Sequence, residues 1–354
     1  MPVVSLYLNG SDVSAPQLAM FHSLRHEQLE ARREFLEGEN HAGRMSVRDD
    51  LAKIEESLQN LAPGRMPSSV TFRAGSQLNR TFNVPARTPK RLTIDIDPLI
   101  LPLDVILASH HKALVVQVTK GDARFTTHHL GHEQQVQEIK ATALADAVDE
   151  SDAAEQRHRL EHLRQHLRSV EQATAPLTQR YGCDVLVLAG AEPVIDELRL
   201  LLPHTPSSLV IGTLHPSPED TVADRQRGVA ALLERHRADE EAGWSERLAE
   251  ARGNGLAASG LAAVIADANS GVIRSLYVSD RLSTPGYICR RHHYVSLASG
   301  SCELDGTALT YVEDVVDELV ELATSRGVEL WIFEARPDLL DASQGVAAVR
   351  YPTE

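Results

Sequence analysis

The chain has few aromatic residues, few cysteines and no long apolar run. Phe, Trp and Tyr make up only 4% of its 354 residues, so its cores must pack mainly through Leu, Val, Ile and Ala. Three cysteines are too few, and odd in number, for a disulfide framework. No apolar run approaches the roughly 18 residues that a membrane helix needs. The N-terminus MPVVSLYLNGSD also lacks the basic region and apolar core of a signal peptide, so we expect a cytoplasmic protein.

Positive charge is also scarce. The formal net charge is −15 at pH 7, which excludes indiscriminate binding to nucleic acid because most of the surface would repel phosphates. Any contact with RNA must therefore come from a local basic patch. The length and the hydrophobic fraction of 42% are sufficient for two or three separate cores.

The first segment, 1–105, predicts an α+β domain. A short apolar strand, 3–8, precedes two helices, 17–36 and 47–61, whose apolar residues recur at three- and four-residue steps. Three strand-like runs follow, namely SVTFRAG, LNRTFNVP and RLTIDID. Gly75-Ser76-Gln77 predicts a hairpin turn between the first two runs, and the prolines of PLILPL mark the end of the domain.

The second segment, 106–218, predicts a sheet covered by helices. KALVVQV (112–118) and ARFTT are expected to be strands, followed by a polar loop over 128–155 and a long helix over 154–180. The runs DVLVLAG, PVIDELRLLLP and SLVIGT then form a strand–helix–strand unit. Apolar strands around an amphipathic helix indicate a mostly parallel sheet with both faces covered.

The third segment, 219–354, again predicts an α/β domain. A charged helix, 219–252, leads to a helix of small residues that Gly271 closes. The strand VIRSLYVS, an irregular insertion (280–306), an acidic helix (311–326) and the strand VELWIF come next. The three segments together predict an α/β protein of three domains.

Three landmarks occur in order along the chain. They are the proline-bounded junction PLILPLDVILASHHKALVVQVTKGDARF, the run DVLVLAGAEPVIDELRLLLP, and the C-terminal set GNGLAASGLAAVIADANSGVIRSLYVSD with the acidic helix and GVAAVRYP. In this order and spacing, the chain resembles the bacterial relatives of the archaeal and eukaryotic class-I release factors and Pelota. The C-terminal set is most similar to actinobacterial members that sit on idle or stalled ribosomes.

The resemblance implies a role for each segment. Segment 1–105 would probe the decoding region of the small ribosomal subunit, and segment 106–218 would carry a ribonuclease-H-like sheet with helices. Segment 219–354 would comprise a linking helix and a kink-turn-binding, ribosomal-protein-like α/β sandwich. The implied partners are the ribosome, through the rRNA of its A site, and a translational GTPase. We also expect the protein to be a monomer, to have no membrane partner and to bind no cofactor other than zinc.

One departure from the family decides the expected mechanism. Active release factors carry Gly-Gly-Gln on a loop before a long helix, where the glycines let the backbone enter the peptidyl-transferase centre and the glutamine backbone helps to orient water. The equivalent stretch, HHLGHEQQVQEIKATALADAVDESDAAEQ, has one glycine, no Gly-x-Gln and an acidic composition. Gly75-Ser76-Gln77 is a relaxed match, but we interpret it as an ordinary hairpin tip. We therefore expect no hydrolysis of peptidyl-tRNA.

A basic patch is the candidate RNA-binding surface. Its six cations occur without one acidic residue between them, and they are Arg65, Arg73, Arg80, Arg87, Lys90 and Arg91. The resemblance implies RNA contact in this domain, and arginine binds phosphate in bidentate fashion. The alternative is a solvated positive face that only favours solubility. Strand alternation predicts that the nearby Phe72 and Phe82 point into the core and do not stack on bases.

The insertion near residue 290 contains a candidate metal site. Cys289, His292, His293 and Cys302 supply ligands at short spacing that suit tetrahedral zinc. Asp305 stands where related proteins often have a second cysteine, and adjacent histidines on an extended strand point apart. The alternative is a remnant without metal, in which the cysteines are small apolar side chains.

Three other groups of side chains have a plainer explanation. His158, His162 and His166 recur at four-residue steps on a helix, which indicates a solvated or interdomain face more than a metal stripe. Asp95 and Asp97 share one strand face, as in metal nucleases, but surface alternation fits equally well. The acidic helix predicts a solvated face or a contact for a basic partner, through Glu313, Asp314, Asp317, Glu318 and Glu321.

Three hypotheses for the function follow from these features. The first is a non-catalytic factor that occupies the A site of idle or stalled ribosomes, in hibernation or rescue. The second is an enzyme, a peptidyl-tRNA hydrolase or nuclease that uses a non-standard site in the central domain. The third is an adaptor that binds only protein partners through its acidic surface.

Overall fold

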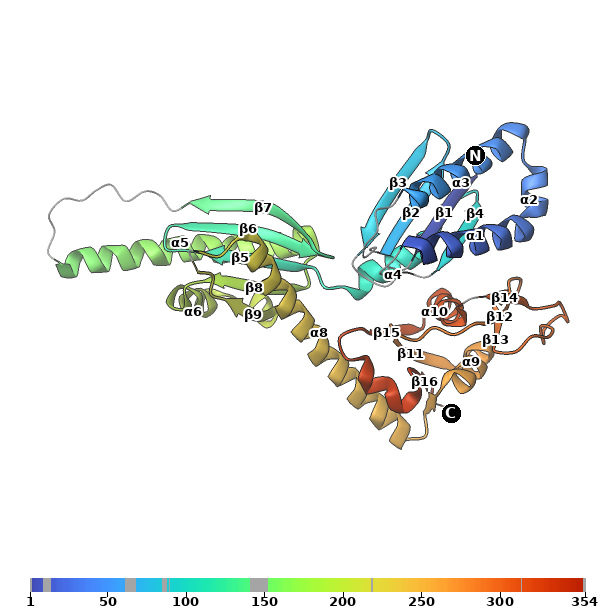
Figure 1. The fold of residues 1–354 in the computed structure, drawn as a ribbon. Coiled ribbons are helices and arrows are strands. Elements are labelled where there is room, and N and C mark those ends of the chain that lie inside the picture. Colours follow the sequence, from blue (N-terminus) through green and yellow to red (C-terminus); the bar gives the residue numbers. More distant parts are fainter. Residues whose placement is uncertain are drawn as a thin grey trace. The chain divides into compact units, whose positions relative to one another are not determined.

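The computed structural model describes residues 2–8, 14–60, 68–84, 88, 90–140, 152–217, 219–312 and 314–352. The chain forms two compact units, whose elements are labelled in Figure 1. Unit 1 combines Met1–Ser109 with Glu241–Glu354, and unit 2 is His110–Glu240. No helix among these residues combines the length and apolar character that membrane crossing requires.

The first part of unit 1 is an antiparallel sheet with helices on one face. Its strand order is β3-β2-β1-β4. The elements are β1 (Val3–Leu8), α1 (Ser14–Ala31), α2 (Arg33–Gly38), α3 (His41–Gln59), β2 (Ser68–Ala74), β3 (Leu78–Val84), β4 (Arg91–Asp95) and α4 (Leu101–Ser109). Val4, Leu6 and Leu8 of β1 share one core with Leu51 and Ile54 of α3. The apolar residues that alternate along the predicted strand and those that recur along the predicted helix therefore pack against each other in this core.

The hairpin between β2 and β3 turns where the sequence predicts. Gly75 has φ +56°, a conformation that glycine adopts without strain. The buried carboxylate of Asp50 on α3 accepts the N–H of Gly75 at 2.7 Å and lies 3.5 Å from Nε of Arg73. One of the two aromatic predictions is wrong, because Phe72 is buried but Phe82 is 45% exposed. Phe82 lies on the edge strand β3, which has a neighbour on one side only.

Unit 2 is a five-stranded mixed sheet in the order β7-β6-β5-β8-β9. The pairs β5/β8 and β8/β9 are parallel, whereas β5/β6 and β6/β7 are antiparallel. Its elements are β5 (Ala113–Val118), β6 (Asp122–His129), β7 (His132–Lys140), α5 (Asp152–Tyr181), β8 (Val185–Gly190), α6 (Glu192–Leu201), α7 (His204–Ser208) and β9 (Val210–Leu214). The sheet is therefore less parallel than the sequence predicts, because a hairpin extends it.

That hairpin corrects the prediction of a polar loop over 128–155. Residues 132–140 form β7, and the turn consists of Leu130 (φ +48°) and Gly131 (φ +74°). Two positive φ values in a two-residue turn match the right-handed twist of hairpin strands. The single glycine of the predicted release loop thus serves a hairpin turn. Val136 and Ile139 of β7 pack on the core, but the polar residues between them hide this strand from a periodicity analysis.

The second part of unit 1 has two small sheets, ordered β10-β16-β11-β15 and β13-β12-β14. The elements are β10 (Ala257–Ser259), α9 (Leu261–Ser270), β11 (Ile273–Ser279), β12 (Gly286–Cys289), β13 (Tyr294–Ser296), β14 (Thr310–Val312), α10 (Val315–Ser325), β15 (Glu329–Phe333), a 3₁₀ helix (Pro337–Ser343) and β16 (Val346–Arg350). The insertion predicted as irregular thus contains β12 and β13. The acidic helix begins later than predicted, with Asp314 as its N-cap and Tyr311 in β14.

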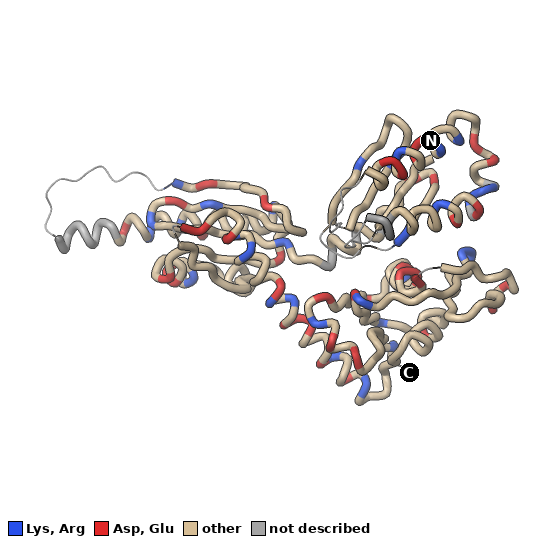
Figure 2. Tube along the Cα trace, viewed as in Figure 1, with Lys and Arg blue, Asp and Glu red and all other residues tan. Residues whose placement is uncertain are grey.

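Helix α8 (Val222–Gly253) contributes side chains to both units. Acidic and basic residues are interspersed along it (Figure 2). Its Glu241 is fully buried in unit 1 and accepts three backbone N–H groups, from Glu334 (2.9 Å), Ala335 (3.0 Å) and Arg336 (2.6 Å). This carboxylate holds the chain directly after β15, since three charge-assisted hydrogen bonds meet on it.

We expect Glu241→Gln to lower the free energy of unfolding by about 2 kcal/mol. The amide keeps one acceptor oxygen but brings an NH₂ group towards backbone donors, and the hydrogen bonds are no longer charge-assisted. Denaturant unfolding of the full chain measures the change. Glu246→Gln, the same substitution at an exposed position of α8, is the control and should cost less than about 0.5 kcal/mol. Equal effects of the two variants would contradict the role of Glu241.

Candidate functional site

The structure divides the predicted basic patch. Arg65 and Arg87 lie outside the described residues. Arg73 is 13% exposed and pairs with the buried Asp50, so it belongs to the interior of the first sheet. Arg80 lies on β3 and is exposed. Lys90 is half-buried, and its backbone N–H donates to Asp317 at 3.2 Å.

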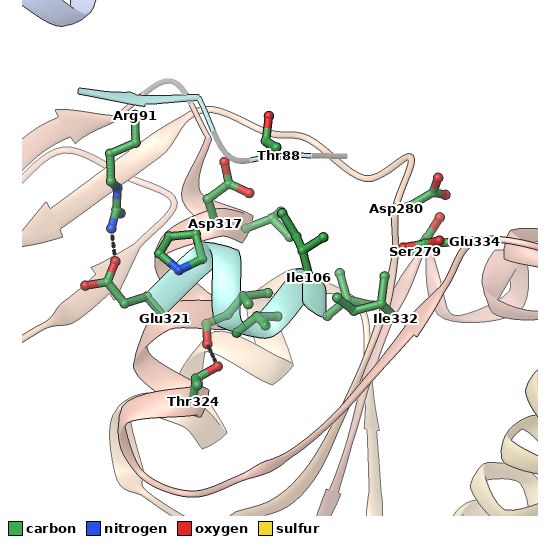
Figure 3. A pocket seen from close by; sticks show the side chains of 15 residues that line it. Thr88, Arg91, Ile106, Ser279, Asp280, Asp317, Glu321, Thr324, Ile332 and Glu334 are labelled. Atoms are coloured by element: carbon green, nitrogen blue, oxygen red, sulfur yellow. Dashed lines mark hydrogen bonds and ion pairs between the residues drawn. The ribbon is translucent and has the colours of Figure 1, made fainter. Parts of the chain in front are cut away.

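Arg91 is the patch residue with the most extensive contacts. Its guanidinium pairs with Glu318 of α10 at 2.6 Å. It also pairs with Glu321, as Figure 3 shows. The Arg91 side chain is 14% exposed and that of Glu318 is 9% exposed. The acidic helix is predicted to contact a basic partner, and Arg91 of the same chain is such a partner. Glu313, which was predicted to share this face, lies outside the described residues.

A small apolar pocket lies beside this ion pair (Figure 3). Its volume is about 100 Å³, and it lies within unit 1. Ile106 of α4, Val320 of α10 and Ile332 of β15 line it, and Asp317 and Glu321 contribute acidic groups. Apolar walls with carboxylates suit the packing of α4 and do not suit a phosphate ligand.

Arg80 and Phe82 share one face of the first sheet. Arg80 pairs with Phe72 across the hairpin and Phe82 pairs with Val70, so all four side chains lie on the same side. On β1, Ser5 pairs with Phe72 and Tyr7 pairs with Val70, whereas Val4 and Leu6 belong to the core that the helices cover. Side chains alternate along a strand, so Arg80 and Phe82 lie on the side of the sheet opposite α1 and α3. An exposed arginine beside an exposed aromatic ring can bind a phosphate and stack on a base.

The insertion brings four potential metal ligands together. His292 Nδ1 lies 3.7 Å from Sγ of Cys289, 3.7 Å from Sγ of Cys302 and 3.5 Å from Oδ2 of Asp305. Ligands bound at about 2.0–2.3 Å to one tetrahedral zinc ion are about 3.3–3.8 Å apart, so this spacing fits zinc. Both cysteines are buried, and all four donor atoms lie within 4.8 Å of one another.

His293 does not belong to this cluster. It has φ +52° and is separated from the four ligand atoms that gather around His292, whereas Asp305 takes the fourth position. The neighbouring arginines are engaged as well. Arg290 forms an ion pair with Glu27 of α1, and Arg291 lies 3.8 Å from Asp305. The set of donors is thus Cys₂-His-Asp in place of the predicted Cys₂-His₂.

The remaining sequence candidates do not form sites among the described residues. His166 is 4% exposed, so this member of the histidine stripe is not solvated, and the side chain of His158 is outside the described residues. Asp95 is paired with Arg32, so it does not join Asp97 in a carboxylate pair. Sequence reasoning also missed a cluster of His111, His236 and Glu240 in unit 2. The four-residue step from His236 to Glu240 on a helix is the signal that could have found part of it.

Residues 98–241 match the family model described as bacterial archaeo-eukaryotic release factor family 10. This segment of the chain is similar to the bacterial relatives of the archaeal and eukaryotic release factors. The matched segment nearly coincides with unit 2. It contains no Gly-Gly-Gln, because none of its glycines is followed by a second one. A search of curated proteins found no match.

Several solved structures are similar to this chain. The archaeal translation termination factor aRF1 is 13% identical, covers 99% of this chain and 92% of its own, and has a TM-score of 0.28. Archaeoglobus fulgidus Pelota is 17% identical with coverages of 81% and 79% and a TM-score of 0.37. S. cerevisiae Dom34 is 13% identical with coverages of 79% and 74% and a TM-score of 0.41.

We expect Arg91→Ala to lower the free energy of unfolding by about 3 kcal/mol. The substitution leaves Glu318 buried without its partner, which is the costly way to break a buried ion pair. Denaturant unfolding measures this change. Arg33→Ala removes an exposed pair with Glu37 and should cost only about 0.5 kcal/mol. A loss below about 1 kcal/mol for Arg91→Ala would show that the pair contributes little.

We expect the Cys₂-His-Asp cluster to bind one zinc ion. Cobalt substituted for zinc should give a thiolate-to-cobalt charge-transfer absorption that Cys302→Ser weakens or abolishes. His293→Ala is the matched control and should leave the absorption unchanged. Cys183 does not confuse the signal, because burial raises the pKa of its thiol to about 11 and keeps it protonated. Absence of the band in the unmodified chain would identify the cluster as a remnant without metal.

Proposed function

We propose that the protein is a non-catalytic ribosome-binding factor that occupies the A site of idle or stalled ribosomes in the cytoplasm. The match of residues 98–241 to a release-factor family is the observation that carries this proposal. The absence of Gly-Gly-Gln from that segment supports a role without peptidyl-tRNA hydrolysis. The use of Gly131 in a hairpin turn supports it further, since that glycine is the only one in the stretch equivalent to the release loop.

The proposal extends to the type of each domain. Three antiparallel strands followed by two parallel ones support a ribonuclease-H-like sheet in unit 2. The mixed sheet of β10, β16, β11 and β15, with α9 and α10, supports a kink-turn-type α/β sandwich in the C-terminal part. The first sheet would then be the part that meets rRNA of the small subunit.

Within the first sheet, we assign the RNA contact to Arg80 and Phe82. Arg73 and Arg91 already have carboxylate partners, so using them for RNA would leave Asp50 or Glu318 as an unpaired buried charge. Arg80 carries no such cost, because it lies exposed on the edge strand β3. Stacking of a base on Phe82 would add about 1–3 kcal/mol without depending on sequence.

A translational GTPase is the second partner in this proposal. One similar structure is described as a model of ribosome-bound archaeal Pelota and ABCE1, and Dom34 is described as interacting with Hbs1. These descriptions concern those proteins. They motivate testing the present chain with ribosomes first alone and then with a translational GTPase.

Co-sedimentation of the full chain with vacant 70S ribosomes across a salt series tests the proposal. We expect saturable binding that weakens as salt rises, and Arg80→Glu should reduce the log–log salt slope by roughly 0.7–0.9 for each phosphate that the chain then fails to neutralise. Lys53→Glu on α3 reverses an exposed charge on the other side of the first sheet and is the matched control. Arg73→Glu is unsuitable, because it would place two carboxylates together in the interior.

Three outcomes would contradict parts of the proposal. Absence of binding at low salt, with and without a GTPase, would reject ribosome binding altogether. Binding that is equally insensitive to Arg80→Glu and Lys53→Glu would favour an adaptor that uses protein contacts. Release of peptide from purified peptidyl-tRNA, abolished by changes within 128–155, would favour the enzyme.

A further inference from the structure

Three ligand-type side chains converge on one point of unit 2. His111 lies two residues before the start of β5, whereas His236 and Glu240 lie one turn apart on α8. His111 Nε2 is 2.6 Å from Oε2 of Glu240, and His236 Nε2 is 3.9 Å from Oε1 of Glu240. The ligand atoms of all three side chains lie within 4.8 Å of one another, and each side chain is partly exposed. A four-residue step places His236 and Glu240 on one face of the helix.

A fourth residue holds the first ligand in position. His111 Nδ1 lies 2.8 Å from Oδ2 of Asp184, and the other oxygen of Asp184 accepts the backbone N–H of Lys112 at 2.7 Å. A carboxylate that accepts Nδ1–H fixes the ring orientation and leaves Nε2 as the free ligand nitrogen. Metal-binding histidines are usually oriented by a carboxylate in this way.

Positive charge is favoured at this point. The carboxylates of Asp184 and Glu240 both contact His111, so negative charge surrounds this point and favours a cation. Lys112 lies next in the chain and opposes a cation, but two carboxylates outweigh it.

We propose that His111, His236 and Glu240 form a binding site for a divalent transition-metal cation of the zinc class, with Asp184 as the residue that positions His111. Neutral imidazole nitrogens and a carboxylate oxygen are the donors that zinc accepts, and water would complete four-coordination. Ligands of such an ion are about 3.3 Å apart, so the observed 2.6 Å must open and the observed 3.9 Å must close, each by less than about 1 Å. The ion would take the place of the direct contact between His111 Nε2 and Glu240.

The ligands of this site come from the two ends of unit 2. Unit 2 begins at His110 and ends at Glu240, so His111 lies at its start and His236 and Glu240 lie at its end. An ion bound here ties the start of β5 to α8 within unit 2. It thereby joins the two points at which the chain passes into and out of this unit.

Zinc binding to the full chain in the Cys289→Ser, Cys302→Ser background tests the proposal, because this background lacks the thiolate cluster. Equilibrium dialysis after chelator treatment should find one zinc ion per chain. His236→Ala should weaken binding more than tenfold, and Asp184→Asn should weaken it roughly 10–100-fold. Asp239→Asn, next to Glu240 but exposed, is the matched control and should bind like the background. Bound cobalt should show ligand-field bands without a thiolate charge-transfer band.

Two results would overturn the proposal. One is the absence of zinc binding in that background, and the other is binding that His236→Ala leaves unchanged. If the double cysteine variant unfolds, the same comparison is made in the unmodified chain, where His236→Ala must lower the number of ions bound by one. His236 is suited to this test, because its described contacts are only the 3.9 Å approach to Glu240 and the ring contact with His111. No ribosome takes part, so the result is independent of the proposed function.

Discussion

The need to pair charges that leave water governs how unit 1 is built. A charged group buried without a partner costs several kcal/mol, so each one must meet an opposite charge or a set of hydrogen bonds. Arg91 meets Glu318 and Glu321, Arg73 meets Asp50, and Glu241 meets three backbone N–H groups. The chain has 50 acidic and 35 basic side chains, so every arginine used in this way reduces a small supply.

This constraint explains why a run of basic residues in the sequence does not form a continuous basic surface. The six cations between 65 and 91 are adjacent in sequence, but strand alternation and distant carboxylates give them different environments. Arg91 and Glu318 are more than two hundred residues apart, and no local pattern connects them. The acidic face of α10 and Arg91 of the basic patch are therefore partners of each other. Arg80 remains exposed because its edge strand has no further neighbour.

Local periodicity predicts elements well and fails where burial is partial. Helix α5 runs over 152–181 where 154–180 is predicted, because its apolar residues recur along one face of the helix. Strand β7 was missed because only Val136 and Ile139 interrupt its polar sequence. Phe82 was misassigned because alternation gives the side of a strand but not whether anything covers that side. The cysteine–histidine cluster was found because its ligands are close in sequence, whereas His111 and Glu240 are 129 residues apart and only the fold joins them.

The acidic surface has a consequence for how an RNA-binding role would work. Non-specific binding to RNA is almost wholly electrostatic, and a net charge of −15 opposes it. A protein of this charge gains affinity only where shape brings the few exposed cations and Phe82 against the nucleic acid at short range, since stacking is far less sensitive to salt than phosphate contacts are. Over the rest of the surface, the carboxylates repel phosphates and so weaken binding to any RNA that lacks the matching shape. Specificity then comes from an unfavourable energy with the wrong RNA. In the proposed role, the excess of carboxylates therefore favours one ribosomal site over the surrounding RNA.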